Sequence, residues 1–359
     1  EVIELTQPSQ TVTFSGLRAR PVPSILRGFS APVVLTHDLS DADRAHLLAY
    51  DTDPFNRWEA GNILARKSLL AMILDDAAPD AAYLTGIKAA MTDSALDPAS
   101  RAFMAATPTP AQLAAALHDQ GHAADPDAIY SAKERLAQAK AESMADVAHE
   151  IYAAHQVTQA YRPDAEQTGK RTLANVMLRF ISRLDGGETA AAQYANADNM
   201  TQQLAALSAL LTAEQGDAPL QAFETQWRAD RLVMDKWFGL QVSHAKPDDA
   251  VATARRLTEH PDFNHKNPNR FRAVLGALAG NHAGFHHASG AGYAMLADWL
   301  ITLDPINPQT TARMCAAFQT WKRYDADRQA LMLAQVDRIL ATPDLSRDAT
   351  EMLSRIRAA

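Results

Sequence analysis

Candidate helices in this chain begin again and again at an Asp-Pro or Asn-Pro pair. The pairs are Asp53-Pro54, Asp97-Pro98, Asp125-Pro126, Asn267-Pro268 and Asn307-Pro308. The acidic or amide side chain can cap free backbone N–H groups, and proline at the first helical position removes no hydrogen bond that the helix would otherwise make. A chain with this recurrent signal is therefore predicted to form many helices joined by short connections.

Apolar residues at helical spacing follow these starts. One segment carries Trp58, Ile63, Leu64, Leu69 and Leu70, and a later one carries Leu173, Val176, Met177, Phe180, Ile181 and Leu184. Residues three and four positions apart share one helix face. We expect roughly fifteen helices with short links, which favours stacked helical pairs over a single bundle. The predicted fold is all-α, an α-solenoid or superhelix, and an irregular one because the sequence shows no strict repeat.

Residues 1–36 have a different pattern, which is typical of β-strands. Val2 to Leu5 and Thr11 to Leu17 alternate and contain β-branched residues, and Ala31 to Leu35 is a short apolar run. Three short strands do not form a stable sheet alone. We therefore expect their partner strands to lie upstream, so that the chain is a piece of a longer protein.

The charge and cysteine content exclude some kinds of partner. The net charge is -8 and no basic block is present, which argues against nucleic acid and against an anionic membrane surface. No apolar run reaches the length of a membrane span. The single cysteine, Cys315, excludes an internal disulfide, and its neighbours predict a buried, unreactive thiol on a helix. This favours a reducing compartment and leaves a periplasmic location open.

Two histidine pairs resemble fragments of a zinc motif. His118 and His122 have the spacing of a zinc-protease helix, with Asp119 where that motif has glutamate. However, Gly121 and the Ala-Ala-Asp-Pro that follows His122 indicate a helix end, and no third ligand is placed. We therefore expect a solvent-exposed helix terminus. His149 and His155 are six residues apart and lie on different faces of a helix.

The stretch from Asn267 to Tyr293 concentrates histidines, arginines and glycines, as an active site would. His282, His286 and His287 could bind a metal, but loop histidines without a nearby carboxylate or cysteine are more often structural groups held by hydrogen bonds. No phosphate-binding glycine loop and no Gly-x-Ser-x-Gly elbow is present. The sequence therefore predicts no catalytic residues and no metal site in this chain.

The arginines near this stretch are candidate ligands for a carboxylate. Arg270 and Arg272 occupy the first turn of a predicted helix, and Arg313 lies near the start of the next long one. A guanidinium is a rigid fork that matches a carboxylate. The alternative is pairing with nearby acids such as Asp304 or Asp325, and spacing alone favours that alternative.

A series of separate motifs, in order along almost the whole chain, resembles the carboxy-terminal part of bacterial aminopeptidase N. The motifs are Leu26-Arg27-Gly28-Phe29-Ser30-Ala31-Pro32-Val33, Asp53-Pro54-Phe55-Asn56-Arg57-Trp58-Glu59-Ala60, Asn199-Met200-Thr201 with Leu204-Ala205-Ala206-Leu207, Leu232-Val233-Met234-Asp235-Lys236-Trp237-Phe238, Asn267-Pro268-Asn269-Arg270-Phe271-Arg272, Gly292-Tyr293, Asn307-Pro308-Gln309, and Lys322-Arg323-Tyr324-Asp325 with Arg328-Gln329.

The resemblance implies a piece of a zinc-dependent alanyl aminopeptidase of the gluzincin class, which removes amino-terminal residues from peptides. Residues 1–36 would be the last strands of a β-sandwich domain, and residues 37–359 the α-helical carboxy-terminal domain. The family's zinc-binding helix has no counterpart here, so the zinc and the catalysis would belong to the parent protein and not to this chain. We expect a cytoplasmic monomer whose partners are an upstream catalytic domain of the same polypeptide and peptide substrates.

In that family the helical domain closes over the catalytic domain and leaves an internal chamber, which caps the active site and restricts access to small or unfolded peptides. The motif matches place two chamber arginines at Arg272 and Arg313, where a positive charge would attract the carboxylate of the peptide. The resemblance thus favours a binding role for these two, though not for Arg270. The alternative function is a free-standing helical-repeat module that binds a peptide or protein on its concave face.

Overall fold

The structure, a computed structural model, describes residues 2–359 and is built almost wholly from helices. The first half of the chain forms α1 (Asp41–Tyr50), α2 (Pro54–Leu74), α3 (Ala81–Thr92), α4 (Pro98–Met104), α5 (Pro110–Asp119), α6 (Pro126–Met144), α7 (Ala148–Ala154) and α8 (Ala165–Asp185). The middle forms α9 (Glu188–Asn196), α10 (Met200–Thr212), α11 (Asp217–Trp227), α12 (Arg231–His244) and α13 (Ala250–Thr258).

The last third contains α14 (Pro268–Phe271), α15 (Ala277–Gly280), α16 (His282–Phe285), α17 (Ala291–Leu303), α18 (Pro308–Cys315), α19 (Ala326–Leu340) and α20 (Arg347–Ala358). The 3-10 turns are η1 (Arg27–Phe29), η2 (Pro247–Asp249), η4 (Ala316–Phe318) and η5 (Trp321–Arg323), and η3 (Arg272–Gly276) is π-helical. The predicted all-α class is confirmed. The segments outnumber the roughly fifteen helices expected from periodicity, because η3 divides one helix and short helices fill several connections.

Every predicted Asp-Pro and Asn-Pro helix start is confirmed. Helices α2, α4, α6, α14 and α18 each begin at the proline, and the preceding side chain accepts a hydrogen bond from a first-turn backbone N–H. At α2, for example, Asp53 Oδ1 accepts from the Asn56 N–H at 3.0 Å. Each cap of this kind contributes about 1 kcal/mol.

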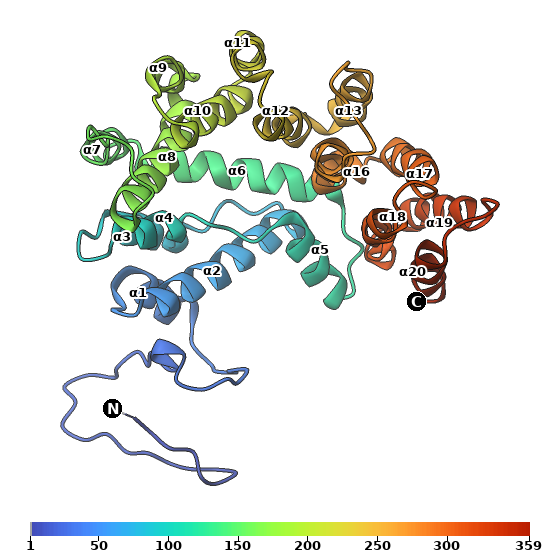
Figure 1. Cartoon of the computed structure of the whole chain (residues 1–359). Coiled ribbons are helices and arrows are strands. Elements are labelled where there is room, and N and C mark those ends of the chain that lie inside the picture. The colour runs from blue at the N-terminus through green and yellow to red at the C-terminus, as the bar shows by residue number, and fades with distance from the viewer. Residues whose placement is uncertain (1) are drawn as a thin grey trace.

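The helices stack in pairs along an arc (Figure 1). Helices α7, α9, α11 and α13 form an outer row, and α8, α10, α12 and α14–α16 lie inside it. Helix α6 crosses the middle of the molecule between this inner row and α2, α4 and α5, and α17–α20 continue the arc to the C-terminus. The arrangement is the irregular superhelix that the sequence predicted.

One apolar core runs through the stack from Leu48 of α1 to Ile356 of α20. The predicted core positions of α8 are buried, except that Leu184 is 43% exposed because the helix ends one residue later. Cys315 is buried as predicted, and burial raises the pKa of its thiol to about 12. Within residues 2–359, no helix is both long and apolar enough for a membrane span.

The strands expected in residues 1–36 are not formed within the described residues 2–36. This segment contains only the short turn η1, and apolar side chains such as Val34, which is 98% exposed, lie in solvent. The physical reason is that a strand needs a neighbouring strand for its N–H and C=O groups, and no described segment pairs with this one in that way. The segment is anchored near η1, where Arg27 pairs with Asp51 at 2.5 Å and the Gly28 N–H donates to Asp53 at 3.0 Å.

Candidate functional site

The Asn267 stretch forms one helix that widens into a π-helix at Arg272. Asn267 caps α14 by accepting from the Asn269 N–H at 2.9 Å, and the helix continues through η3 into α15. In η3 the Ala277 N–H donates to the Arg272 carbonyl, five residues back. A π segment is rare, occurs mostly as a single turn inside an α-helix, and is frequently found at functional sites. Arg272, one of the two arginines favoured by sequence, is its first residue.

Arg270 and Arg272 project to different environments. Arg270 is buried and its Nε donates to Asp235 Oδ1 at 2.5 Å, while its guanidinium lies 4.4 Å from the centre of the Phe238 ring. Arg272 is exposed, and its one hydrogen bond goes to Asn269 Oδ1 at 2.7 Å. Arg270 therefore fastens α14 to α12, and Arg272 keeps a guanidinium that no described carboxylate neutralises.

Arg313 has a similar exposure on the neighbouring helix α18. Its guanidinium forms no hydrogen bond or ion pair with the described residues, and it lies beside Met314. A methyl group added to Gly276 in η3 would lie 4.0 Å from Met314 Cε, so α18 packs next to the turn that follows Arg272. The structure thus places the two predicted arginines on adjacent helices.

The acids that could have neutralised these arginines are occupied elsewhere. Asp304 is buried and accepts from the Ser346 N–H at 2.7 Å and the Ser346 hydroxyl at 2.6 Å. Asp325 caps α19 and pairs with Arg328 at 2.7 Å. The pairing alternative that spacing favoured is therefore wrong for Arg272 and Arg313, and for Arg270 it holds with a different acid, Asp235.

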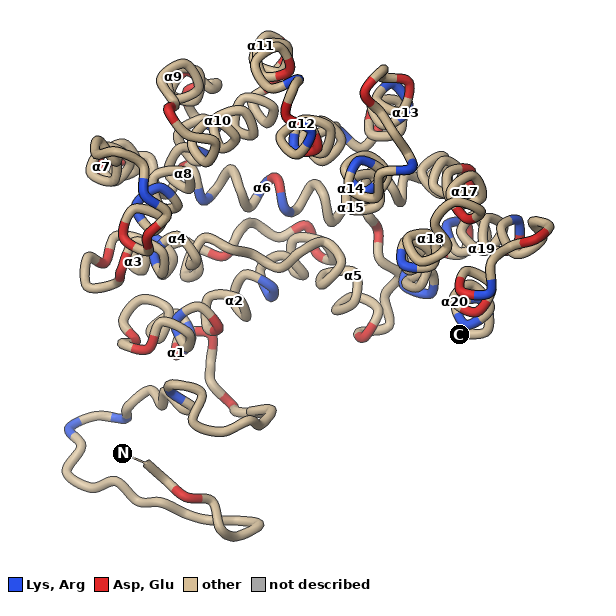
Figure 2. The backbone as a smooth tube through the Cα atoms, viewed as in Figure 1, with Lys and Arg blue, Asp and Glu red and all other residues tan. Residues whose placement is uncertain are grey.

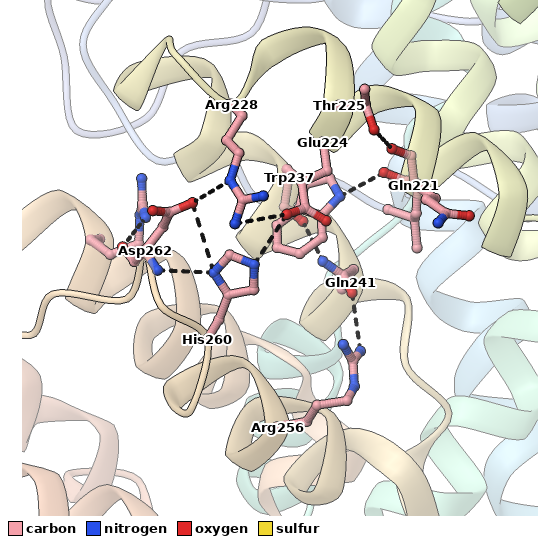
Figure 3. A network of polar contacts seen from close by, with 11 residues as sticks. Gln221, Glu224, Thr225, Arg228, Trp237, Gln241, Arg256, His260 and Asp262 are labelled. Atoms are coloured by element: carbon pink, nitrogen blue, oxygen red, sulfur yellow. Dashed lines mark hydrogen bonds and ion pairs between the residues drawn. The ribbon is translucent and has the colours of Figure 1, made fainter.

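A polar network fixes the connection that leads into α14 (Figure 3). His260 Nε2 lies 3.2 Å from Glu224 Oε1, and the His260 Nδ1 accepts from the Asp262 N–H at 3.1 Å. Arg228 contacts both carboxylates, at 3.7 Å from Glu224 and 3.3 Å from Asp262. The Asp262 carbonyl in turn accepts from Arg270 Nη1. This network joins α11 to Arg270 at the start of α14.

The three histidines after α15 do not gather at one point. His286 is buried with its Nδ1 2.9 Å from the Tyr293 hydroxyl and its Nε2 2.9 Å from the Tyr324 hydroxyl, and His282 Nε2 lies 3.1 Å from the same Tyr324 oxygen. His287 faces Asp248 at 3.2 Å. The prediction that all three histidines lie in a loop was wrong for His282, which lies on the short helix α16. The prediction that the histidines are structural groups held by hydrogen bonds is confirmed.

Burial lowers the pKa values of two of these histidines, His282 and His286. It lowers the pKa of His282 to about 4, with Arg323 and Arg328 as further repulsive charges. It lowers the pKa of His286 to about 2, with His282 and Arg328 as further repulsive charges. Both rings are therefore neutral at neutral pH. A neutral imidazole has one acceptor nitrogen and one N–H donor, so His286 accepts from one of its two tyrosine hydroxyls and donates to the other. The cluster ties α16 to α17 and to the start of α19.

The glycines of the stretch serve turns and close packing. Gly290 has φ +68° and precedes α17, a conformation that favours glycine. A methyl group on Gly284 would lie 2.4 Å from the Ala250 methyl, and one on Gly292 would lie 2.6 Å from the Phe285 carbonyl oxygen. Gly290 thus forms the turn between α16 and α17, and Gly284 and Gly292 permit close packing of neighbouring segments.

His118 and His122 do not form a zinc site with any third ligand among the described residues. Helix α5 ends at Asp119, Gly121 has φ +82°, and His118 and His122 are both exposed, which confirms the predicted helix terminus. Across residues 2–359, no group of three His, Cys, Asp or Glu side chains is close enough to hold a metal ion.

Sequence reasoning missed Asn269 and Tyr324. Asn269 holds Arg272 from one turn earlier, and its signal was the spacing of three residues on a helix. Tyr324 joins His282 and His286 from a distant part of the chain, for which no local signal exists.

The geometry defines a helical-repeat domain with an exposed pair of arginines on adjacent helices. The chain belongs to the family described as "Domain of unknown function (DUF3458_C) ARM repeats", whose model matches residues 41–358. A second family model, described as "Domain of unknown function (DUF3458) Ig-like fold", matches residues 1–38.

Curated relatives confirm the resemblance to bacterial aminopeptidase N. The chain is 37% identical over 365 residues to "Aminopeptidase N" of Caulobacter vibrioides, and 35% identical over 371 residues to that of Escherichia coli. In both cases 99% of this chain is covered but only 42% of the relative, so the chain spans about two fifths of their length. The crystal structure of Legionella pneumophila aminopeptidase A in complex with aspartic acid matches 96% of this chain and 41% of its own, with TM-score 0.83 and 27% identity.

Proposed function

We propose that this chain is the non-catalytic, chamber-forming region of a zinc-dependent aminopeptidase N, which removes amino-terminal residues from peptides. The relatives named aminopeptidase, each more than twice the length that the chain covers, support this assignment. The zinc and the catalytic residues would belong to an upstream domain of the same polypeptide, and residues 1–36 would complete a β-sandwich that joins that domain to the helices. The parent protein would be a cytoplasmic monomer.

The observation that carries the proposal is that Arg272 and Arg313 are exposed and have no carboxylate partner among the described residues. Both guanidiniums are exposed and unmatched by carboxylates, on adjacent helices, and Arg272 begins a π-helical segment. Such a pair suits the carboxylate of a peptide whose amino end lies at the zinc. The helical arc would cap the active site, and enclosure would restrict access to small or unfolded peptides.

Kinetics of the intact aminopeptidase test this role. Arg272→Ala is expected to raise KM for short peptides roughly fivefold to tenfold, because one charge-assisted contact contributes about 1–1.5 kcal/mol. Arg347→Ala is the matched control, since Arg347 is exposed and unpaired in this structure but lies on α20, outside the segment that carries Arg272. Equal kinetics for Arg272→Ala and the unmodified enzyme would remove the arginine from the binding site.

The alternative is a free-standing module that binds a peptide or protein on its own. It is favoured only by the helical-repeat fold. Sequencing of the reading frame upstream of Glu1 separates the two functions: a zinc-binding helix there supports the aminopeptidase, and a start codon directly before Glu1 supports the module.

A further inference from the structure

An open cavity of about 400 Å³ lies among α10, α11, α12 and α13. Its lining comes from the last turns of α10 and α12, the connection that follows α12, Leu220 of α11 and one face of α13. Small-molecule sites in proteins have volumes of about 300–1,000 Å³, so the size is suitable for a ligand. We call it the α13 cavity. Neither Arg272 nor Arg313 lines it, so it is separate from the arginine pair described above.

Two opposite charges without ion-pair partners lie on one face of α13, a helix around which both signs of charge occur (Figure 2). Four lining residues have the spacing i, i+3, i+4 and i+7 of a single helix face: Asp249, Ala252, Thr253 and Arg256. Asp249 precedes α13 and already has helical φ and ψ. Asp249 and Arg256 are both exposed, and neither forms an ion pair with residues 2–359. The two residues between them are small and leave the cavity open.

A buried glutamine holds Arg256 at the wall of the α13 cavity (Figure 3). Gln241 is 6% exposed, its Nε2 donates to the Trp237 carbonyl at 3.1 Å, and its Oε1 accepts from Arg256 Nη2 at 3.0 Å. Because an amide oxygen carries no net charge, this contact orients the guanidinium without neutralising it. The other N–H groups of the guanidinium stay available for a carboxylate.

Two other polar side chains of the lining already have partners. Lys246 pairs with Glu214 at 2.7 Å, and His244 Nε2 lies 2.7 Å from the Ser208 hydroxyl oxygen. Glu214 first, and Asp249 at longer range, raise the pKa of Lys246. The ammonium of Lys246 is therefore occupied by Glu214, and Asp249 and Arg256 are the charges of the lining that a ligand can pair with.

Apolar side chains complete the lining of the α13 cavity. Leu211 of α10 and Leu220 of α11 are partly buried against the core and also line the cavity. Another cavity, between α1 and α3, has nearly the same volume, 410 Å³, but none of its lining residues is Lys, Arg, Asp or Glu. Volume therefore does not distinguish the α13 cavity. Its distinction is a pair of separated, opposite charges beside apolar surface, which is the pattern of a site for a zwitterion with an apolar body.

We propose that the α13 cavity binds a short zwitterionic peptide of about three residues, between Asp249 and Arg256. Residues seven positions apart on a helix are separated by about 10 Å along its axis. The amino nitrogen and carboxyl carbon of a free amino acid are only about 2.5 Å apart, whereas an extended peptide spans about 3.3–3.6 Å per residue. The peptide ammonium would pair with Asp249 and its carboxylate with the fork of Arg256, while an apolar side chain contacts Leu211 and Leu220.

Calorimetric titration of the 359-residue chain with the tripeptide Ala-Leu-Ala tests the site. Saturable 1:1 binding is expected, and Arg256→Gln should raise the Kd about tenfold because one charged fork is lost. Arg255→Gln is the matched control, since Arg255 is exposed on the same helix but does not line the cavity, and it should leave the Kd unchanged. Arg272→Ala should leave it unchanged too; loss of binding in that variant would place the peptide at the arginine pair and overturn the proposal.

Peptides with blocked ends give a second readout that needs no variant of the chain. The carboxy-terminal amide and the N-acetyl form of Ala-Leu-Ala should each bind about tenfold more weakly, because each lacks one of the two charges. Arg256→Gln should not weaken binding of the amide further. The proposal is also overturned if Ala-Leu-Ala shows no saturable binding up to about 10 mM, if its amide binds as tightly as the free acid, or if Arg256→Gln binds the tripeptide as tightly as the unmodified chain.

Discussion

At the scale of single residues, two arginines have different roles because their surroundings differ. Arg270 and Arg272 are two positions apart, yet the first is buried on Asp235 and the second is exposed with only Asn269 as a partner. Spacing could not distinguish them, because the acid that pairs with Arg270 comes from another helix. The family resemblance supplied the distinction, and the contacts of the two side chains agree with it.

The neutral histidines predict a pH-dependent stability. The pKa values of His282 and His286 are lowered from 6.5 to about 4 and about 2, so below about pH 6.5 the unfolded chain binds protons that the native chain does not. The free energy of unfolding should therefore fall as the pH drops from about 6.5 toward 4, by roughly 1.4 kcal/mol per pH unit for each histidine. Urea denaturation across this range measures the slope.

His286→Gln should make that slope shallower by roughly 1.4 kcal/mol per pH unit, since glutamine cannot take up the proton. Its stability at neutral pH should be lower because a hydrogen bond to Tyr293 or Tyr324 is lost. His118→Gln, at an exposed histidine, is the control and should follow the unmodified chain. A slope for His286→Gln that also matches the unmodified chain would show that His286 is not buried in its neutral form.

At the scale of helices, local signals predicted the starts well and the interior geometry poorly. The proline positions of α2, α4, α6, α14 and α18 follow from caps that need only neighbouring residues. The π-helical segment at Arg272 and the contacts of Tyr324 with His282 and His286 could not be predicted, because they depend on helices distant in the sequence.

Close helix packing predicts a contrast between two glycine substitutions. Gly292→Ala should destabilise the chain by about 1–3 kcal/mol, because the new methyl would lie 2.6 Å from the Phe285 carbonyl oxygen and force α16 and α17 apart. Gly280→Ala is the matched control, since no atom lies within 4 Å of its added methyl. Thermal unfolding of the two variants measures the difference. Equal unfolding temperatures would contradict the packing of α16 on α17.

At the scale of the whole molecule, the helical arc is continuous and the described amino-terminal residues 2–36 form no strands. One apolar core joins α1 to α20, whereas the described residues 2–36 leave apolar side chains such as Val34 exposed. Composition and periodicity were sufficient to predict the arc. They could not predict how residues 1–36 fold, because strands acquire their structure from partners that pair with them. The division of the chain near residue 36 stays a prediction.

The central claim is that Arg272 and Arg313 bind the carboxylate end of a peptide whose amino end is cleaved elsewhere in the same enzyme. The most direct test compares a short peptide with its carboxy-terminal amide in the intact aminopeptidase and in the Arg272→Ala/Arg313→Ala variant. We expect the variant to raise KM at least about tenfold for the free acid and to leave KM for the amide nearly unchanged, because only the acid carries the charge that the arginines bind. Equal changes for acid and amide, or no change for either, would contradict the claim.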